Sequence, residues 1–208
     1  MIHIENMKIK KMGKILLDNT NIVLKDKVVI LGPHKSGKTA LLQAICGKGK
    51  ITSGQILLSD EFIKENNIGD QKGVFMYIPK DYSNFFKDLS VKHILTFFAR
   101  NTDHSLLLKD GNIELNFKFK DLSNIQKLIL FMDIGRKNNK KIFILDEPFV
   151  NLDLVETSIF KKIYSDHLND KSVILTSNTY SHTILDFEQN LYIHNKKLIE
   201  EDPFVQIL

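Results

Sequence analysis

The sequence predicts an α/β fold, and three observations lead to that prediction. Apolar residues alternate or run in short blocks near both ends of the chain, as they do in strands. Helical periodicity separates these runs, and a glycine-rich stretch joins one strand directly to one helix. With 208 residues, 43% of them hydrophobic, the chain can bury the core of one domain. We expect a single domain over residues 1–208, with a mostly parallel sheet core, antiparallel N-terminal strands and a helical subdomain inserted at about residues 80–140.

Residues 1–31 are expected to form four short strands, with the sequences IHIENMKI, GKILLD, TNIVL and KVVIL. KVVIL ends at Gly32, and from Lys38 the pattern becomes helical. Gly47 is expected to end that helix, because glycine readily takes the left-handed conformation found at helix ends. The apolar positions of the helix are Leu41, Leu42, Ala44 and Ile45.

Later strands are predicted at QILLS (55–59), GVFMYIP (73–79), KIFIL (141–145) and SVILT (172–176). The last two are almost wholly apolar, as buried parallel strands on either side of a helix are. NLYIH and KKLIEE, near the C-terminus, are typical of a hairpin.

Two helices are predicted in the middle of the chain. VKHILTFFAR (91–100) is one, and the other runs from Ser123 to about Asn138. Ser123 and Gln126 match the Ser-x-x-Gln capping box, in which each side chain bonds a free N–H at the helix start. One face of this helix carries Ile125, Leu128, Ile129 and Met132.

The charge balance and the single cysteine narrow the function classes. The net charge of +4 is mild and scattered, so we interpret the Lys pairs as a solvated surface and expect no nucleic-acid partner. Cys46 is the only cysteine, which excludes an intrachain disulfide and fits a reducing cytoplasm. The N-terminus lacks the apolar segment of a signal peptide, and no apolar run approaches the ~18 residues that span a bilayer. If the protein acts at a membrane, we expect another chain to supply the membrane-spanning segments.

GPHKSGKT, residues 32–39, fits the phosphate-binding pattern G-x-x-x-x-G-K-[ST] between a strand and a helix. Glycines let backbone N–H groups wrap around phosphate, and the helix start adds its positive dipole end. Lys38 can neutralise the terminal phosphates, and the Thr39 hydroxyl can ligate Mg²⁺. The side chains of His34 and Lys35 are expected to face solvent. The residues we place around the nucleotide are Gly32, Pro33, His34, Lys35, Ser36, Gly37, Lys38, Thr39 and Ala40.

Asp146 and Glu147 follow the apolar strand IFIL. A carboxylate at the end of a buried strand can hold Mg²⁺, and we give Asp146 that role. The adjacent Glu147 points elsewhere and can act as a general base on the attacking water. Together with the glycine-rich loop, these acids predict a nucleotide site.

These motifs resemble the ATP-binding subunit of ABC transporters over nearly the whole chain. GPHKSGKT matches the Walker A motif, IFILDEP matches Walker B with its glutamate, NLD (151–153) matches the D-loop, and LSNIQ matches the LSGGQ signature. The resemblance implies a P-loop NTPase fold of ABC type that takes ATP and Mg²⁺. It also implies a dimer in which each Walker A faces the partner's signature, coupled to an integral membrane permease. The place of action would be cytoplasmic, peripheral on the inner face of the cell membrane.

The signature departs from the family pattern because Asn124 and Ile125 replace its two glycines. Ser123 and Gln126 are retained, so we expect LSNIQ to be both a helix cap and a phosphate contact through Ser123. Isoleucine is stiff and β-branched, so the grip on ATP across the dimer should be looser.

Three further positions depart from the family. Lys80 stands where the Q-loop glutamine is expected, and it cannot accept a hydrogen bond. Asn178 stands at the switch histidine; its amide can bond the γ-phosphate but cannot shuttle a proton, and His182 is a less favoured substitute. No aromatic residue precedes residue 32 to stack on adenine, and Met12 is the closest stand-in.

The insert after Lys80 would, by resemblance, dock the permease. Phe85, Phe86, Phe97 and Phe98 are candidates for an exposed aromatic groove, although we expect at least two of them in the subdomain core.

Three functional interpretations remain. The first is a transport ATPase that hydrolyses Mg-ATP, slowly when alone. The second is a near-inactive, nucleotide-gated binding or regulatory subunit. The third pairs this chain with a fuller ABC ATP-binding subunit, so the dimer is a homodimer or a heterodimer.

Overall fold

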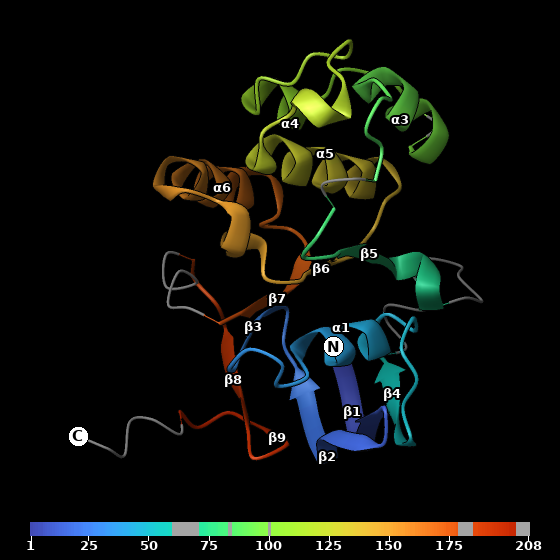
Figure 1. The fold of residues 1–208 in the computed structure, drawn as a ribbon, viewed down its shortest axis with the longest axis vertical. Helices are drawn as coiled ribbons and strands as arrows, with labels where there is room; N and C mark the ends of the chain where they lie inside the picture. Colours follow the sequence, from blue (N-terminus) through green and yellow to red (C-terminus); the bar gives the residue numbers. More distant parts are fainter. Residues whose placement is uncertain (60–70, 83–84, 100, 179–184, 203–208) are drawn as a thin grey trace.

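The computed structural model describes residues 1–59, 71–82, 85–99, 101–178 and 185–202, and it contains two sheets (Figure 1). The smaller sheet is antiparallel, in the order β2-β1-β4. The larger has the order β5-β6-β7-β3-β8-β9, in which the first five strands are parallel and β9 pairs antiparallel with β8. The elements are β1 Ile2–Lys11, β2 Lys14–Leu24, β3 Lys27–Leu31, α1 Lys38–Ile45, β4 Ser53–Leu58, η1 Gln71–Val74, β5 Phe75–Ile78, α3 Val91–Phe98, α4 Leu106–Asp110, η2 Phe119–Asp121, α5 Asn124–Lys137, β6 Ile142–Leu145, η3 Pro148–Asn151, α6 Leu154–His167, β7 Ser172–Ser177, β8 Gln189–His194 and β9 Lys197–Ile199.

The α/β fold class is therefore confirmed, with one correction among the N-terminal strands. GKILLD and TNIVL are not separate strands but one continuous strand, β2. The pairing of β1 with β2 shifts register three times, and two of the shifts lie close to Asn6 and Asn19, whose φ angles are 48° and 46°. Asparagine tolerates this left-handed conformation, so each strand absorbs an extra residue as a bulge instead of ending. A smaller correction concerns GVFMYIP, where Gly73 and Val74 belong to the 3₁₀ turn η1 and the strand begins at Phe75.

The parallel sheet lies between two hydrophobic cores. Helices α3 to α6 pack on one face, and α1 with the antiparallel sheet covers the other. Every residue of β3 and β6 is buried, as expected for central parallel strands. The predicted apolar face of α5 (Ile125, Leu128, Ile129 and Met132) is buried as well. The carboxyl ends of β3, β5, β6 and β7 therefore lie along one edge of the sheet, which positions the site.

The expectation that at least two of four phenylalanines join the core is wrong. Phe86 packs against the core, with its ring centroid 5.4 Å from that of Phe119. Phe85, Phe97 and Phe98 are 54%, 70% and 49% exposed. The reason is that α3 is only eight residues long and buries Val91, Ile94 and Leu95, so its last turn extends beyond the core.

Candidate functional site

The glycine-rich loop lies between the buried strand β3 and helix α1, as the sequence predicts. Gly37 precedes the helix with a φ of 111°, a left-handed conformation that favours glycine. A Cβ on Gly37 would lie 3.2 Å from Leu16 Cβ, and one on Gly32 would lie 2.9 Å from Ser36 Oγ. A side chain at either position would therefore force a neighbouring atom to move.

The loop also holds a buried polar group without a partner. Ser36 Oγ has no hydrogen bond within the described part of the chain, and α1 has no side-chain cap at its N-terminus. A buried hydroxyl without a partner is costly and normally indicates a missing ligand or water. His34 and Lys35 are exposed, as expected, and Thr39 is exposed at the helix start. The donor set fits an anionic ligand such as a polyphosphate.

Lys38 is the first residue of α1, directly after this loop, and it is buried. Its ammonium group donates to the carbonyl oxygens of Gly32 at 2.7 Å and Pro33 at 3.0 Å. It also lies 3.1 Å from Glu147 Oε1. The structure therefore brings together the loop lysine and the acidic strand end, which are far apart in the sequence.

Asp146 is buried at the end of β6 and is held from both neighbouring strands. Thr176 in β7 donates through Oγ1 to Asp146 Oδ1 at 2.9 Å, and Tyr77 in β5 donates to Oδ2 at 3.3 Å. Burial and the nearby Asp146 raise the pKa of Tyr77, so the phenol stays a donor. The side chains of Asp146 and Thr39 offer the hard oxygen ligands that Mg²⁺ prefers, and their joint role as metal ligands stays a prediction.

Glu147 is buried and has a left-handed backbone, with φ 48° and ψ 52°. Its N–H donates to Thr176 Oγ1 at 2.9 Å, which helps to hold this strained conformation. Its carboxylate lies between two ammonium groups, Lys38 on Oε1 and Lys80 on Oε2 at 2.5 Å. Burial raises the pKa of Glu147, but the bonds from Lys80 and Lys38 outweigh it and hold the pKa below its usual value.

The contact between Lys80 and Glu147 is the feature that sequence reasoning missed. Ile78 in β5 pairs with Leu145 in β6, so the residues two positions further on come level with each other. That register places Lys80 beside Glu147. Lys80 and Glu147 each follow a predicted strand, but their contact could be predicted only by knowing that these two strands are neighbours.

The phosphate loop, Lys80 and Glu147 line a cavity of about 330 Å³. Met12, the expected contact for the base, is 93% exposed at the tip of the β1–β2 hairpin. Lys11 and Leu16 from the same hairpin line the cavity instead. The lining residues are Lys11, Leu16, His34, Lys35, Ser36, Gly37, Lys38, Thr39, Ala40, Lys80 and Glu147.

The signature segment LSNIQ forms the start of α5, and its capping box is confirmed. Ser123 Oγ accepts from the N–H of Gln126, whose side chain accepts from the N–H of Ser123. The N–H of Ile125 donates to Glu156 Oε1 at 3.3 Å. Side chains of the same chain therefore accept from the N–H groups at this helix start. Ser123 lines a second cavity, of about 690 Å³, and its contact with phosphate stays a prediction.

Asn124, which replaces the first signature glycine, takes part in a chain of hydrogen bonds. Its side-chain amide donates to the carbonyl of Asn151 at 2.7 Å. The amide of Asn151 in turn donates to the carbonyl of Lys80 at 3.2 Å. The signature, the D-loop and the segment after β5 are thus linked in series.

Asn178 is exposed directly after β7. Because Ser177 pairs with Leu31, Asn178 comes level with Gly32 at the start of the phosphate loop. Its contact with a γ-phosphate stays a prediction. His182 lies outside the described residues.

Known proteins share both the sequence pattern and the fold. A family model described as ABC transporter matches residues 14–150. The cytochrome c biogenesis ATP-binding export protein CcmA of Reclinomonas americana is 27% identical over 194 residues, which cover 87% of this chain and 84% of that protein. The zinc import ATP-binding protein ZnuC of Wolbachia pipientis wMel is 26% identical, over 98% of this chain and 83% of its own.

Among solved structures, the ATP-binding cassette MJ0796 bound to ADP and Pi superposes with a TM-score of 0.73 at 18% identity, covering 98% of this chain and all of that one. A bacterial Atm1-family ABC exporter with ATP bound superposes with a TM-score of 0.77 at 16% identity, covering this chain fully and 39% of its own. No helix in the described ranges is long and apolar enough to cross a membrane. The motifs, the match over residues 14–150 and the shared fold together show that this chain belongs to the ABC transporter family, as an ATP-binding cassette.

Proposed function

We propose that the chain binds Mg-ATP and hydrolyses it as the motor subunit of an ABC transporter. The supporting observation is the meeting of Lys38, Glu147 and the open phosphate loop at one cavity. In this proposal the loop and Lys38 hold the phosphates, and Thr39 with Asp146 holds Mg²⁺. The bound Mg²⁺ would offset part of the phosphate charge.

Glu147 is proposed as the general base for the attacking water. Its carboxylate already pairs with two lysines, and a carboxylate stabilised in this way is a weaker base. Asn178 is proposed to bond the γ-phosphate without carrying a proton. Both features favour slow turnover by the chain alone.

The proposed partners are a second ABC ATP-binding subunit, identical or different, and an integral membrane permease. The dimer would form around ATP, with the signature of each subunit facing the other's phosphate loop. Phe85, Phe97 and Phe98 offer an exposed aromatic surface for the permease. This assembly would place the chain in the cytoplasm, on the inner face of the cell membrane.

The test is ATP turnover and ATP binding by the purified chain, beside Glu147→Gln and the exposed control Glu114→Gln. We expect slow turnover that disappears in Glu147→Gln, while ATP binding persists and the control behaves as the parent chain. A chain that binds no ATP would overturn the proposal, and so would turnover that survives in Glu147→Gln.

A specific observation favours a second candidate, the near-inactive nucleotide-gated subunit. The donors of Asn124 and Ile125 at the signature are bonded within the chain, so fewer are free for a nucleotide on a partner. Equal background turnover in the parent chain and in Glu147→Gln, with ATP binding and dimer formation preserved, would favour this function.

A further inference from the structure

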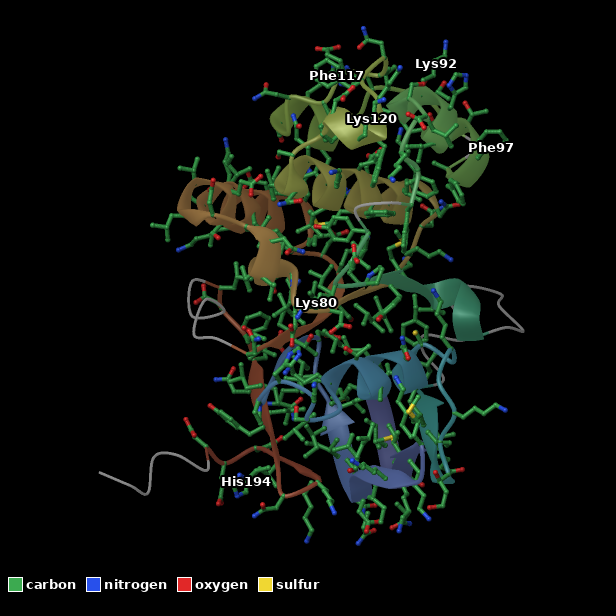
Figure 2. All side chains as sticks on the ribbon, in the orientation of Figure 1. Lys80, Lys92, Phe97, Phe117, Lys120 and His194 are labelled. Carbon is green, nitrogen blue, oxygen red and sulfur yellow. The ribbon has the colours of Figure 1, made fainter. Side chains whose placement is uncertain are left out.

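Lys80 is positioned as a second cation of the phosphate site. It follows β5 directly, and its side chain lines the same cavity as the glycine-rich loop. In Figure 2 it lies near the centre of the molecule, well away from Lys92 and Phe97 at the helical end. Its side chain keeps 35% of its accessible surface, whereas that of Lys38 keeps 3%. Lys80 is therefore the more accessible of the two ammonium groups beside Glu147.

The two lysines differ in how many of their donors are already in use. Each ammonium group has three N–H donors. Those of Lys38 are matched by three acceptors, the carbonyls of Gly32 and Pro33 and the carboxylate of Glu147. Within the described ranges, the ammonium of Lys80 has one acceptor, Glu147 Oε2. Lys80 can therefore keep its bond to Glu147 and still donate to a second anion.

The backbone of Lys80 is anchored by a hydrogen bond, whereas its side chain is bonded only at its end. The carbonyl of Lys80 accepts from the amide of Asn151, and the N–H of Asp146 donates to the carbonyl of Ile78. A long side chain on an anchored backbone can reorient without moving the loop. The cavity also carries more positive than negative charge, with Lys11, Lys35, Lys38 and Lys80 against Glu147. Such a balance attracts a polyphosphate.

We propose that Lys80 is a ligand of the terminal phosphate of a bound nucleoside triphosphate, and that its charge lets this chain bind the triphosphate without a divalent cation. The proposal rests on the proposed function, because it assumes that the glycine-rich loop holds the other phosphates. A diphosphate lacks the group that Lys80 contacts. The residue should therefore distinguish ATP from ADP, most clearly when no metal shares the charge.

The experiment measures the equilibrium binding of radiolabelled ATP and ADP to the full chain, in EDTA and in Mg²⁺. The variants are Lys80→Gln, Lys80→Arg and the exposed control Lys92→Gln, and a thermal melt without nucleotide checks folding. In EDTA we expect Lys80→Gln to weaken ATP binding by about tenfold or more and ADP binding by less than about twofold. Lys80→Arg should recover most of the loss, and Lys92→Gln should lose nothing.

The outcomes separate this proposal from the function on which it rests. ATP binding that requires Mg²⁺ in the parent chain, or equal losses for ATP and ADP in Lys80→Gln, would overturn the role of Lys80 and leave the proposed function standing. An unchanged ATP affinity of Lys80→Gln in EDTA would do the same. No binding of either nucleotide under any condition would overturn both.

Discussion

The start of α1 and the start of α5 both follow short loops, and family resemblance assigns both to phosphate, but their donors are arranged differently. At α1 no side chain caps the helix, and the buried hydroxyl of Ser36 has no partner in the described part of the chain. At α5 a complete capping box closes the first turn, and Glu156 accepts from the N–H of Ile125.

The difference shows how one structural device serves two purposes. A helix start offers free N–H donors and a positive dipole end. Where the chain leaves these donors open, the helix start is suited to an external anion. Where the chain supplies its own oxygens, the same device stabilises the fold. The two starts should therefore respond in opposite ways when their side chains are removed.

The largest expected effect is on nucleotide binding at α1. Lys38→Met should weaken ATP binding by the monomeric chain by about 100-fold, because it removes a positive charge next to the phosphate loop. Ser123→Ala at α5 should change the same affinity by less than about twofold, since Ser123 lines a different cavity. Equilibrium dialysis at low protein concentration measures both. A comparable loss in Ser123→Ala would show that the two helix starts act on the same nucleotide.

An intermediate effect is expected on the stability of the open helix start. Gly37→Ala should lower the free energy of unfolding by about 2–3 kcal/mol, because alanine would be strained at φ 111° and its Cβ would lie 3.2 Å from that of Leu16. Gly13→Ala is the matched control, with φ 75° but no atom within 4 Å of the added Cβ. It should cost only about 1 kcal/mol. Urea unfolding monitored by circular dichroism gives both values, and equal costs would mean that the contact with Leu16 is unimportant.

The smallest effects are the most direct test of the comparison, because one substitution is made at both helix starts. Ser123→Ala should lower the free energy of unfolding by about 1 kcal/mol, through loss of the cap. Ser36→Ala should leave it unchanged or raise it by a few tenths of a kcal/mol, since it removes a buried hydroxyl without a partner. Both are measured by urea unfolding without nucleotide. If Ser36→Ala proved as costly as Ser123→Ala, the hydroxyl of Ser36 would have a structural partner after all.

The parts that could be predicted from the sequence are those with a strong local pattern. The strand–loop–helix unit around the phosphate loop, the buried strands β6 and β7 and the capped start of α5 all follow from periodicity and spacing. The continuous strand β2 was missed because the polar bulge at Asn19 resembles a turn. The number of phenylalanines in the core was overestimated because composition does not reveal where a core ends.

In the candidate site, residue types were predictable but partners were not. Lys80 was noted for what it cannot do, whereas its bond to Glu147 follows from the register between β5 and β6. The contact of Glu156 with the start of α5 spans 31 positions and leaves no local pattern. Both contacts depend on which elements become neighbours, a property of the folded sheet and its helices.

The hydrogen bonds from Asn124 to Asn151 and from Asn151 to Lys80 have a mechanical consequence. They join segments that are 27 and 71 positions apart, and each link attaches to a backbone carbonyl. A tilt of α5 would therefore strain η3 and then the backbone at Lys80. The two amides thus tie the orientation of α5 to the position of the lysine that is bonded to Glu147.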